Sequence, residues 1–182
     1  ITGAASGFGA SIAERFAAEG ARVVVVDLNL EKAQEVASRI GAVAWPCDVS
    51  SSADIERLVA FALEKFGRVD IVVNNAGTTH LNKPAGEVTE AEFDRLYQVN
   101  VKSLFHMNRL VSPVFRQQGA GVFVNVASTT GVRPGPGLCW YSASKGAVLQ
   151  LTRSLATAWA ASEWLRGHVV TGFPDRKSTR LN

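Results

Sequence analysis

The stretch Thr2-Gly3-Ala4-Ala5-Ser6-Gly7-Phe8-Gly9 decides the fold, because it joins the end of an apolar strand to an amphipathic helix that carries Ile12, Ala13 and Phe16. Glycines let the backbone turn tightly and approach a diphosphate, and the N-terminus of the helix attracts the phosphate charge. The alternative is a glycine-rich turn without a ligand, since such a motif is weak in isolation. The spacing Gly-x-x-x-Gly-x-Gly also differs from the Gly-x-Gly-x-x-Gly of other dinucleotide-binding folds.

Asp27 ends the next strand, 18 residues after Gly9. An acid at that position accepts hydrogen bonds from the ribose of an adenosine. The alternatives are a solvated Asp or a cap for a helix over residues 30–40. The charge of Asp27 would repel the 2′-phosphate of NADP, and no Arg or Lys lies within residues 4–6 or directly after Asp27. The sequence therefore favours NAD over NADP.

Short apolar runs alternate with helical periods along the chain. Residues 22–26, 69–73 and 122–126 are rich in valine and of strand length, which predicts strands that are buried on both faces. Apolar residues recur at helical spacing over residues 55–66. This alternation predicts an α/β fold: a single-domain, doubly wound parallel sheet of the Rossmann type, with helices on both faces. A ligand is then expected at the carboxyl ends of the strands.

Capping signals mark the expected helix ends. Ser51 with Asp54 three residues later is a start signal, and Thr89 with Glu92 forms a capping box. Gly20 and Gly41 each follow a helical stretch. Glycine easily takes the left-handed conformation that ends a helix.

Composition and charge exclude several classes of protein. Hydrophobic residues make up 47% and charged residues 19%, which excludes disordered, collagen-like and coiled-coil chains. The formal net charge is +3, of which +2 belongs to the last eight residues, so no basic patch indicates a nucleic-acid partner. The purest apolar runs are too short to span a membrane, and the chain does not open on a basic and then apolar leader. We therefore expect neither a membrane span nor a signal peptide.

The cysteines and histidines do not predict a metal site. Cys47 and Cys139 are far apart, so we expect both to stay reduced, as in the cytoplasm. His80, His106 and His168 share no metal-ligand spacing.

Four motifs together resemble the main branch of the short-chain dehydrogenase/reductase family over roughly residues 1–160. They are residues 2–9, Cys47-Asp48-Val49, Asn74-Asn75-Ala76-Gly77 and Tyr141-Ser142-Ala143-Ser144-Lys145, in that order. The resemblance implies that Asp48 and Val49 hold the adenine, that Asn75 to Gly77 line the middle of the cofactor, and that Asn74 braces the sheet. The cofactor-binding residues that it implies are Thr2, Gly3, Ser6, Gly7, Phe8, Gly9, Asp27, Asp48, Val49, Asn75, Ala76, Gly77, Tyr141 and Lys145.

Tyr141 and Lys145 are four residues apart in a stretch of helical character, so their side chains point to one face. Hydride transfer at a carbon requires a proton donor or acceptor at the substrate oxygen. A phenol is a weak base at neutral pH, and a nearby ammonium group stabilises its anion. By pattern alone, a surface helix that happens to carry Tyr and Lys is an equal alternative.

The resemblance supplies two further catalytic positions. It implies that Ser128, thirteen residues before Tyr141, donates a hydrogen bond to the substrate oxygen, and the family's Ser-x-x-Gly register selects Ser128 over Thr129 and Thr130. Asn100 resembles the family asparagine that holds a water in the proton relay, whereas its position alone predicts a helix kink or a helix start. Lys145 is also implied to bind the nicotinamide ribose. The implied catalytic residues are Asn100, Ser128, Tyr141 and Lys145.

The resemblance implies an oxidoreductase that transfers a hydride between NAD(H) and a small-molecule secondary alcohol or ketone, with the tyrosine as acid and base. The alternative is a non-catalytic dinucleotide-binding scaffold or an inactive fragment. The family also implies a homodimer or homotetramer, paired through the helices expected over residues 101–118 and 140–161. Cys139 and Trp140 adjoin the tyrosine, and packing is favoured over a role in a substrate pocket.

The family pattern covers only part of a domain. Ile1 corresponds to the end of a first strand, and the pattern is lost after residue 161. We therefore expect residues 1–161 to form the cofactor-binding domain without most of its first strand and without its C-terminal strands. Residues 162–182 are expected to be a non-native tail, because the last eight match what a common sequencing-library adapter encodes in frame. The substrate-selecting elements are then missing, and the chain as given is expected to be inactive.

Overall fold

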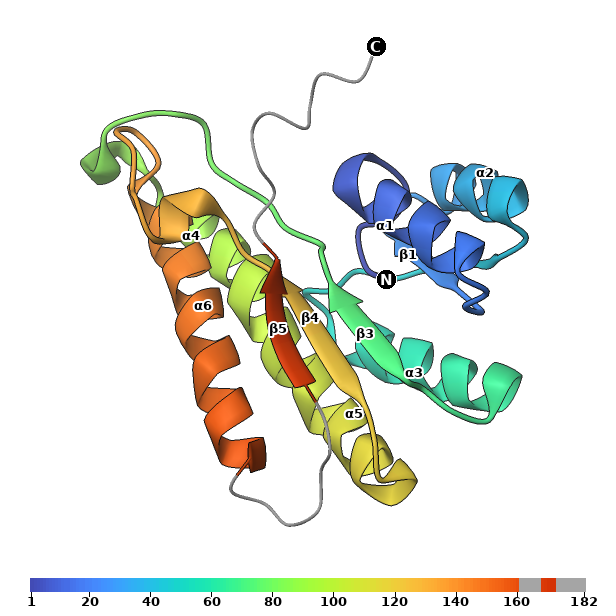
Figure 1. The fold of residues 1–182 in the computed structure, drawn as a ribbon. Coiled ribbons are helices and arrows are strands. Elements are labelled where there is room, and N and C mark those ends of the chain that lie inside the picture. The colour runs from blue at the N-terminus through green and yellow to red at the C-terminus, as the bar shows by residue number, and fades with distance from the viewer. Residues whose placement is uncertain (161–167, 173–182) are drawn as a thin grey trace.

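The computed structural model describes residues 1–160 and 168–172 and contains a parallel sheet in two parts (Figure 1). The first part pairs β1 (Val24–Asp27) with β2 (Val43–Pro46). The second has the order β3 (Ile71–Asn74), β4 (Val122–Val126) and β5 (His168–Gly172). Every pair is parallel, as the alternation of strands and helices predicts. The expected α/β class is therefore confirmed.

Ile1 and Thr2 lie between the two parts of the sheet. Thr2 forms an isolated parallel bridge with Val26. The Val26 amide donates to the Ile1 carbonyl over 3.0 Å, and the Thr2 amide donates to the Val73 carbonyl over 3.0 Å. These two residues thus occupy the place of a strand between β1 and β3.

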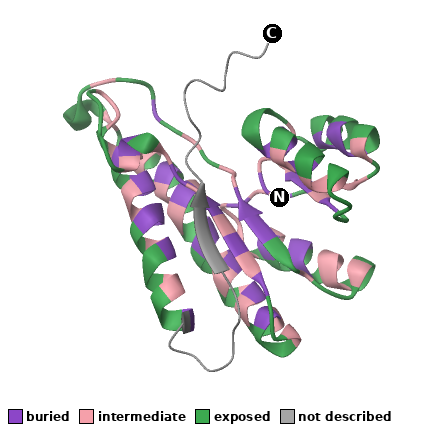
Figure 2. Cartoon of the chain, viewed as in Figure 1, coloured by how far each residue is buried: buried purple, intermediate pink, exposed green. Residues whose placement is uncertain are grey.

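Helices cover both faces of the sheet. On one face, α1 (Gly7–Ala18) and α2 (Leu30–Ile40) pack against β1 around Ala13, Val25 and Val36. On the other face, α3 (Ser52–Phe66) and α5 (Ser103–Gln118) enclose a core with Val26, Val72 and Phe123. Figure 2 shows the buried residues on the sides of the helices that face the strands. Successive residues of β1 therefore belong to opposite cores, which is the double winding that the sequence predicts.

The remaining elements surround the carboxyl ends of β3 and β4. The long helix α6 (Cys139–Ala160) packs beside α5 around Leu104, Val148 and Leu149. A short α4 precedes α5, and a π-helical segment joins them. The bounds of the short elements are η1 (Ala85–Glu87), α4 (Glu90–Tyr97), η2 (Gln98–Lys102) and η3 (Thr129–Gly131).

The predicted helix ends are confirmed. The Ser51 side chain accepts a hydrogen bond from the Asp54 amide at the start of α3, and Thr89 and Glu92 form a reciprocal capping box at the start of α4. Two glycines with positive φ follow α2 and α1, at +65° for Gly41 and +84° for Gly20.

Three features of the strands differ from the sequence-based expectations. The strand predicted over residues 69–73 begins at Ile71, which is 45% exposed because it lies at the open mouth of a cavity between β1 and β3. The short strand β2 was not predicted, since its alternation is weak. Finally, β5 lies within the segment expected to be a non-native tail, where it pairs all along β4. Two adjacent valines in this segment suit a strand that pairs with the edge of β4.

A buried polar network ties the second part of the sheet to α6. The Asn74 side-chain amide donates to the Asn125 oxygen over 2.8 Å, and the Asn125 amide donates to Thr152 Oγ1 over 3.0 Å. Thr152 in turn donates to the Val148 carbonyl. The expectation that Asn74 braces the sheet is confirmed, because its bond joins β3 to β4.

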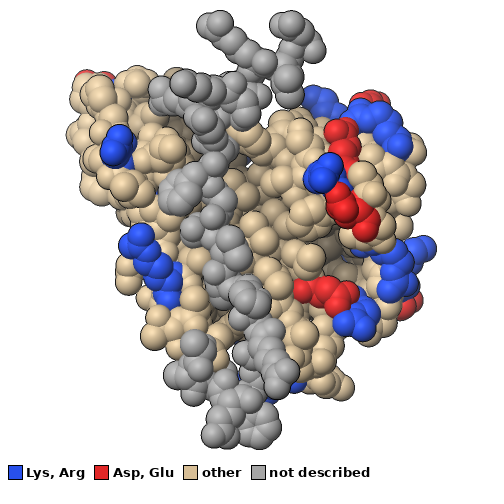
Figure 3. All heavy atoms as spheres, in the orientation of Figure 1, with Lys and Arg blue, Asp and Glu red and all other residues tan. Residues whose placement is uncertain are grey.

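Charged side chains of both signs are interspersed on the face shown in Figure 3, mostly over the part of the molecule with α1 to α3. Exposed ion pairs join Arg39 to Glu14 and Arg57 to Asp54. Within residues 1–160 and 168–172, no helix is both long enough and apolar enough to cross a bilayer.

Candidate active site

The glycine-rich loop after Ile1 is tied to the end of β3. Thr2 Oγ1 accepts hydrogen bonds from the amides of Asn75 and Ala76, each over 3.1 Å. The Asn75 side-chain amide donates to the carbonyls of Thr2 and Gly3, over 2.9 and 3.0 Å. Thr2 is buried, and both polar side chains are used within the protein. Thr2 and Asn75 thus hold the glycine-rich loop against the end of β3.

Glycine is required at two positions of this loop by close approach. A Cβ on Gly9 would collide with the Gly3 carbonyl, and a Cβ on Gly3 would lie 2.9 Å from the Ala76 Cα. Gly3 also has φ +63°, which disfavours a side chain. These contacts hold the start of α1 directly over the loop.

The N-terminus of α1 leaves room for an anion. Gly7 has φ +54°, and a Cβ there would meet no atom within 4 Å, so the space beside it is open. Ser6, the N-cap residue, makes no side-chain capping bond, and Ser6, Gly7 and Phe8 are all exposed. A helix N-terminus with unused backbone N–H groups and open space is suited to bind a diphosphate. The residues present therefore fit the phosphates of a dinucleotide.

A hollow of about 480 Å³ continues from this loop along the carboxyl ends of the strands. This volume lies within the range of small-molecule sites, roughly 300–1,000 Å³. Six of the predicted cofactor-binding residues line it: Gly3, Asp27, Asp48, Val49, Ala76 and Gly77. The structure therefore brings together residues that are up to 74 positions apart in the chain.

Both acidic residues of the hollow are held by backbone amides. The Asp27 carboxylate accepts from the amides of Ala5 and Asn29, over 3.1 and 3.0 Å. Asp48 accepts from the amide and the hydroxyl of Ser50. Asp27 is therefore fixed between the glycine-rich loop and the start of α2, and Asn29 rather than Asp27 caps that helix. The alternative interpretation of Asp27 as the cap was wrong.

Arg95 also lines the hollow, and its charge is opposite in sign to the charges of the two carboxylates. It lies in the last turn of α4 and is exposed. Arg95 was not predicted from the sequence, because it lies far along the chain from Asp27 and not next to it. No local signal could have found it, because α4 reaches the hollow only through the tertiary fold.

Asn100 lies at the centre of a second group of predicted residues. It is 1% exposed and sits in η2, the π-helical turn between α4 and α5. Its side-chain oxygen accepts from the Thr78 amide over 2.8 Å, while its amide donates to the Thr78 carbonyl and to Ser144 Oγ. Ser144 donates to the Tyr141 carbonyl over 2.8 Å. Asn100 thus joins the loop after β3 to the first turn of α6.

Lys145 is the buried cation of the site. It is 5% exposed, and its Nζ donates to the Val126 carbonyl over 2.9 Å. Burial lowers the pKa of Lys145 to about 8. A Cβ on Gly77 would lie 3.3 Å from Lys145 Nζ and 3.4 Å from the Asn100 side-chain oxygen. The lysine, the asparagine and the loop after β3 therefore meet at one point.

Ser128 caps η3 and Tyr141 lies on α6, two elements that adjoin each other. Ser128 follows β4 and caps η3, where its hydroxyl oxygen accepts from the amide and the hydroxyl of Thr130. A Cβ on Gly131 would lie 2.8 Å from the Lys145 carbonyl carbon, so a glycine lets η3 approach the backbone of α6. Tyr141 lies one helical turn before Lys145 and is partly buried. The four predicted catalytic residues thus come from three neighbouring segments at the carboxyl edge of the sheet, with Tyr141 and Lys145 both on α6.

The cysteine and the tryptophan considered in the sequence, Cys47 and Trp140, make contacts within the protein. Burial and the carboxylates of Asp54 and Asp48 raise the pKa of the Cys47 thiol to about 12, so it stays protonated. The Trp140 indole donates to the Ala85 carbonyl and meets Phe93 edge-on. In the part of the chain that the structure describes, no group of three or more side chains could hold a metal ion.

The hollow that Gly3, Asp27 and Gly77 line thus adjoins Lys145 and Asn100 at the carboxyl edge of a parallel, Rossmann-type sheet. The family model described as short chain dehydrogenase matches residues 1–171. The chain belongs to the short-chain dehydrogenase family.

Individual relatives agree with this assignment. The chain is 55% identical over 167 residues to the 4-formylbenzenesulfonate dehydrogenase of Comamonas testosteroni, which covers 89% of the chain and 66% of that relative. It is 42% identical to the 2-(R)-hydroxypropyl-CoM dehydrogenase of Xanthobacter autotrophicus, with 89% and 68% covered. The chain spans 60% to 68% of the length of the curated relatives it matches.

Solved structures show the same fold. A 3-ketoacyl-(acyl-carrier-protein) reductase from Brucella melitensis, complexed with NADH, has a TM-score of 0.89 at 44% identity and covers 95% of this chain and 73% of its own. A metagenomic short-chain oxidoreductase in complex with NADP has a TM-score of 0.88 at 31% identity, with 97% and 81% covered. Both nicotinamide dinucleotides thus occur among the neighbours.

Because Lys145 is buried, the free energy of unfolding should depend on pH. Because the pKa of Lys145 is about 8 instead of 10.5, the folded state is penalised for carrying this charge at neutral pH. The stability should rise as the pH increases from about 8 to 10.5, where only the unfolded chain still holds the proton. Lys145→Met should keep the packing and raise the free energy of unfolding at pH 7, by up to about 3 kcal/mol. This substitution should also remove the rise in the free energy of unfolding above pH 8.

Urea unfolding at pH 7 and pH 9.5 measures both effects, with Lys65→Met on the exposed face of α3 as the control. A Lys145→Met variant that is less stable than the unmodified chain at pH 7 would show that Lys145 is a structural residue.

Proposed function

We propose that the protein is an NAD-dependent dehydrogenase or reductase that transfers a hydride between NAD(H) and an alcohol or carbonyl compound, in the first place a secondary alcohol or ketone. The observation that carries the proposal is the meeting of Asn100, Lys145 and Gly77 beside the hollow that Asp27 and Gly3 line. Dinucleotide binding alone does not require the full set of Asn100, Ser128, Tyr141 and Lys145. The non-catalytic scaffold is therefore the second candidate.

Each residue has a separate task in this proposal. The backbone amides at the start of α1 would bind the diphosphate, and Asp27 would bind the adenosine ribose. Asp48 and Val49 would lie against the adenine, with Arg95 on the other side of the hollow. Ala76 and Gly77 would line the middle of the cofactor. When bound, NAD supplies or accepts the hydride.

The proton moves through the protein's own side chains. The Tyr141 hydroxyl would exchange a proton with the substrate oxygen, and Ser128 would donate a hydrogen bond to the same oxygen. The Lys145 ammonium would stabilise the tyrosinate, since an opposite charge in a desolvated site acts strongly. Asn100 would hold Thr78 and the first turn of α6 in place and orient the water through which Lys145 exchanges its proton.

The compounds to be tested as substrates belong to more than one chemical class. The relatives named above include a dehydrogenase of an aromatic aldehyde and one of a secondary alcohol. A panel of secondary alcohols, ketones and aromatic aldehydes, each with NAD and NADP in the appropriate redox state, tests the activity in the whole protein. We propose that the chain as given is inactive, since it spans only part of its relatives' length.

Tyr141→Phe tests the acid–base role in the whole protein. Without the phenol oxygen, turnover should fall by about 10²–10⁴-fold. NADH affinity, measured by fluorescence titration, should stay within about threefold because the ring is kept. Tyr97→Phe is the matched control, since Tyr97 is the other tyrosine of the chain and lies at the end of α4. More than a tenth of the original turnover in Tyr141→Phe would exclude the proposed role.

Asp27→Asn tests the cofactor preference. The unmodified protein should use NAD with higher catalytic efficiency than NADP, because the carboxylate repels a 2′-phosphate. Asparagine keeps an acceptor oxygen for one of the two amides, of Ala5 or Asn29, and removes the charge. The ratio of efficiencies should shift toward NADP by about tenfold, which corresponds to ~1.4 kcal/mol. Equal efficiencies with both cofactors before mutation would refute the preference.

We also propose that the whole protein is a homodimer or homotetramer, paired through α5 and α6. Phe105 on α5 is 57% exposed, which is unusual for a large apolar side chain. A symmetric contact between such helices would bury it. Light scattering at micromolar concentration should show an oligomer, and Phe105→Glu should shift it toward monomer, whereas Leu81→Glu in the exposed loop after β3 should not. A purely monomeric unmodified protein would contradict this proposal.

We propose a cytoplasmic location from the free cysteines Cys47 and Cys139. Recovery of the protein from another compartment in cell fractionation would count against it.

A further inference from the structure

The tyrosine of the proposed site lies where a helix is held least firmly by its own hydrogen bonds. The helix α6 begins at Cys139, so Tyr141 is its third residue, and Lys145 lies a full turn further in. Amide groups in the first turn of a helix have no partner within the helix. The Ser142 amide donates to the Leu138 carbonyl over 2.8 Å, which closes this first turn. The position of Tyr141 relative to Lys145 therefore depends on contacts from outside α6.

The loop after β3, residues 78–85, supplies such contacts, and we call it the β3 loop. The Lys83 amide donates to the Gly137 carbonyl over 3.1 Å. The Asn82 side-chain amide donates to the Pro136 carbonyl in a longer bond of 3.4 Å. Both acceptors belong to the segment that leads into α6, so these bonds restrict where the helix begins.

A further contact holds the first turn of α6 itself. The Trp140 indole donates to the Ala85 carbonyl, at the end of the β3 loop, over 3.1 Å. The Trp140 ring also meets the Phe93 ring of α4 edge-on, with the ring centroids 5.3 Å apart. Because Trp140 directly precedes Tyr141, a movement of the Trp140 backbone also moves the tyrosine.

The β3 loop is fixed at other points and can therefore act as a support. Thr78, its first residue, shares two hydrogen bonds with the buried side chain of Asn100, over 2.8 and 2.9 Å. Lys83 forms an ion pair with Glu92 of α4 over 2.8 Å, and both side chains are largely buried. The loop is thus joined to α4 and to the π-helical turn as well as to α6.

The β3 loop and the start of α6 pack against each other at Gly137. This glycine has φ +76°, and a Cβ there would collide with the side-chain oxygen and the Cγ of Asn82. An alanine at Gly137 must therefore push the Asn82 side chain away from the Pro136 carbonyl, and it also strains the backbone. By contrast, a Cβ on Gly135, in the same segment, would meet no atom within 4 Å.

We propose that the β3 loop positions Tyr141 against Lys145 by holding the first turn of α6. It acts through three positioning residues, Asn82, Gly137 and Trp140. The proposal rests on the proposed dehydrogenase function, in which the phenol must meet the substrate oxygen while the ammonium group stays beside it. A tyrosine on a frayed turn is in place for only part of the time, so turnover falls accordingly.

Trp140→Phe and Gly137→Ala test the proposal in the whole protein. Trp140→Phe keeps an aromatic ring beside Phe93 but removes the donor to the Ala85 carbonyl. In either variant kcat should fall by about tenfold, because the loss concerns the transition state. The KM of the alcohol and the affinity for NADH should stay within about threefold. Gly135→Ala is the matched control and should keep kcat within about twofold.

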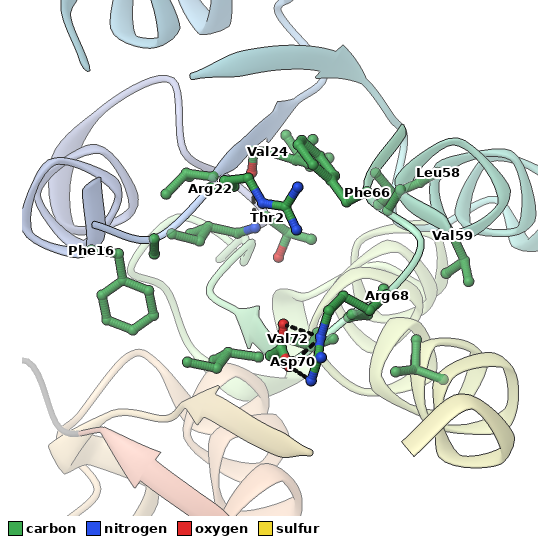
Figure 4. A pocket seen from close by; sticks show the side chains of 18 of the residues that line it. Thr2, Phe16, Arg22, Val24, Leu58, Val59, Phe66, Arg68, Asp70 and Val72 are labelled. Carbon is green, nitrogen blue, oxygen red and sulfur yellow. Dashed lines mark hydrogen bonds and ion pairs between the residues drawn. The ribbon is translucent and has the colours of Figure 1, made fainter. Parts of the chain in front are cut away.

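Hydrogen exchange tests the same support without turnover, in the 182-residue chain. Exchange of the Ser142 amide, which is bonded to the Leu138 carbonyl, reports on fraying of the first turn. In Trp140→Phe and Gly137→Ala this exchange should be at least about tenfold faster. The amides of β1, whose Val24 lines the cavity shown in Figure 4, are the internal reference. They should be unaffected, because β1 lies beyond β3 from α6 (Figure 1).

Gly119→Ala controls for backbone strain. Gly119 follows α5 with φ +72°, close to the +76° of Gly137, and a Cβ there would meet no atom within 4 Å. This variant should strain the backbone to a similar extent and yet leave kcat and the exchange of Ser142 within about twofold.

Slower turnover with unchanged exchange of Ser142, or faster exchange with unchanged turnover, would overturn the proposal. So would an equal effect in Gly135→Ala or Gly119→Ala. If the unmodified whole protein turns over no compound of the panel, the dehydrogenase proposal fails. The exchange of Ser142 then still decides whether the β3 loop holds the first turn of α6.

Discussion

The buried side chain of Asn100 is the constraint on which the arrangement of the site depends. Its three hydrogen bonds hold Thr78, after β3, against Ser144, in the second turn of α6. An α-helix cannot place a side chain there without interruption, and the π-helical turn between α4 and α5 provides the needed offset. An unpaired amide at a 1% exposed position would be costly, so the three segments stay together. Tyr141 and Lys145 are positioned as a consequence.

A second set of contacts positions the cofactor half of the site in the same way. Thr2 and Asn75 use their polar groups on each other's backbone and thereby join the glycine-rich loop to β3. The loop can then present its outer side, with Gly7 and the amides at the start of α1, to a ligand. Residues that a motif marks as cofactor-binding therefore divide into those that face the hollow and those that hold the loop in shape.

Lys145 illustrates the conflict between stability and chemistry. A cation with a 5% exposed side chain and one backbone acceptor in the described structure is unfavourable for folding, and the lowered pKa expresses that cost. The same desolvation strengthens its effect on a neighbouring phenolate. A residue that destabilises the fold and sits beside the reacting groups is typical of a functional site.

The sequence by itself determined the local elements and the order of the motifs. Capping boxes such as Thr89 with Glu92, and valine runs such as residues 122–126, predict helices and strands because their physics is contained within a few residues. The tertiary structure was needed to bring Arg95 to the hollow that Asp27 also lines and to turn Asn75 toward the glycine-rich loop. It also added β5, which pairs with β4 and lies within a segment where no family pattern was recognised. Contacts of this kind join residues dozens of positions apart, and nothing in the local sequence encodes which of them meet. That is decided by how the helices pack over the sheet.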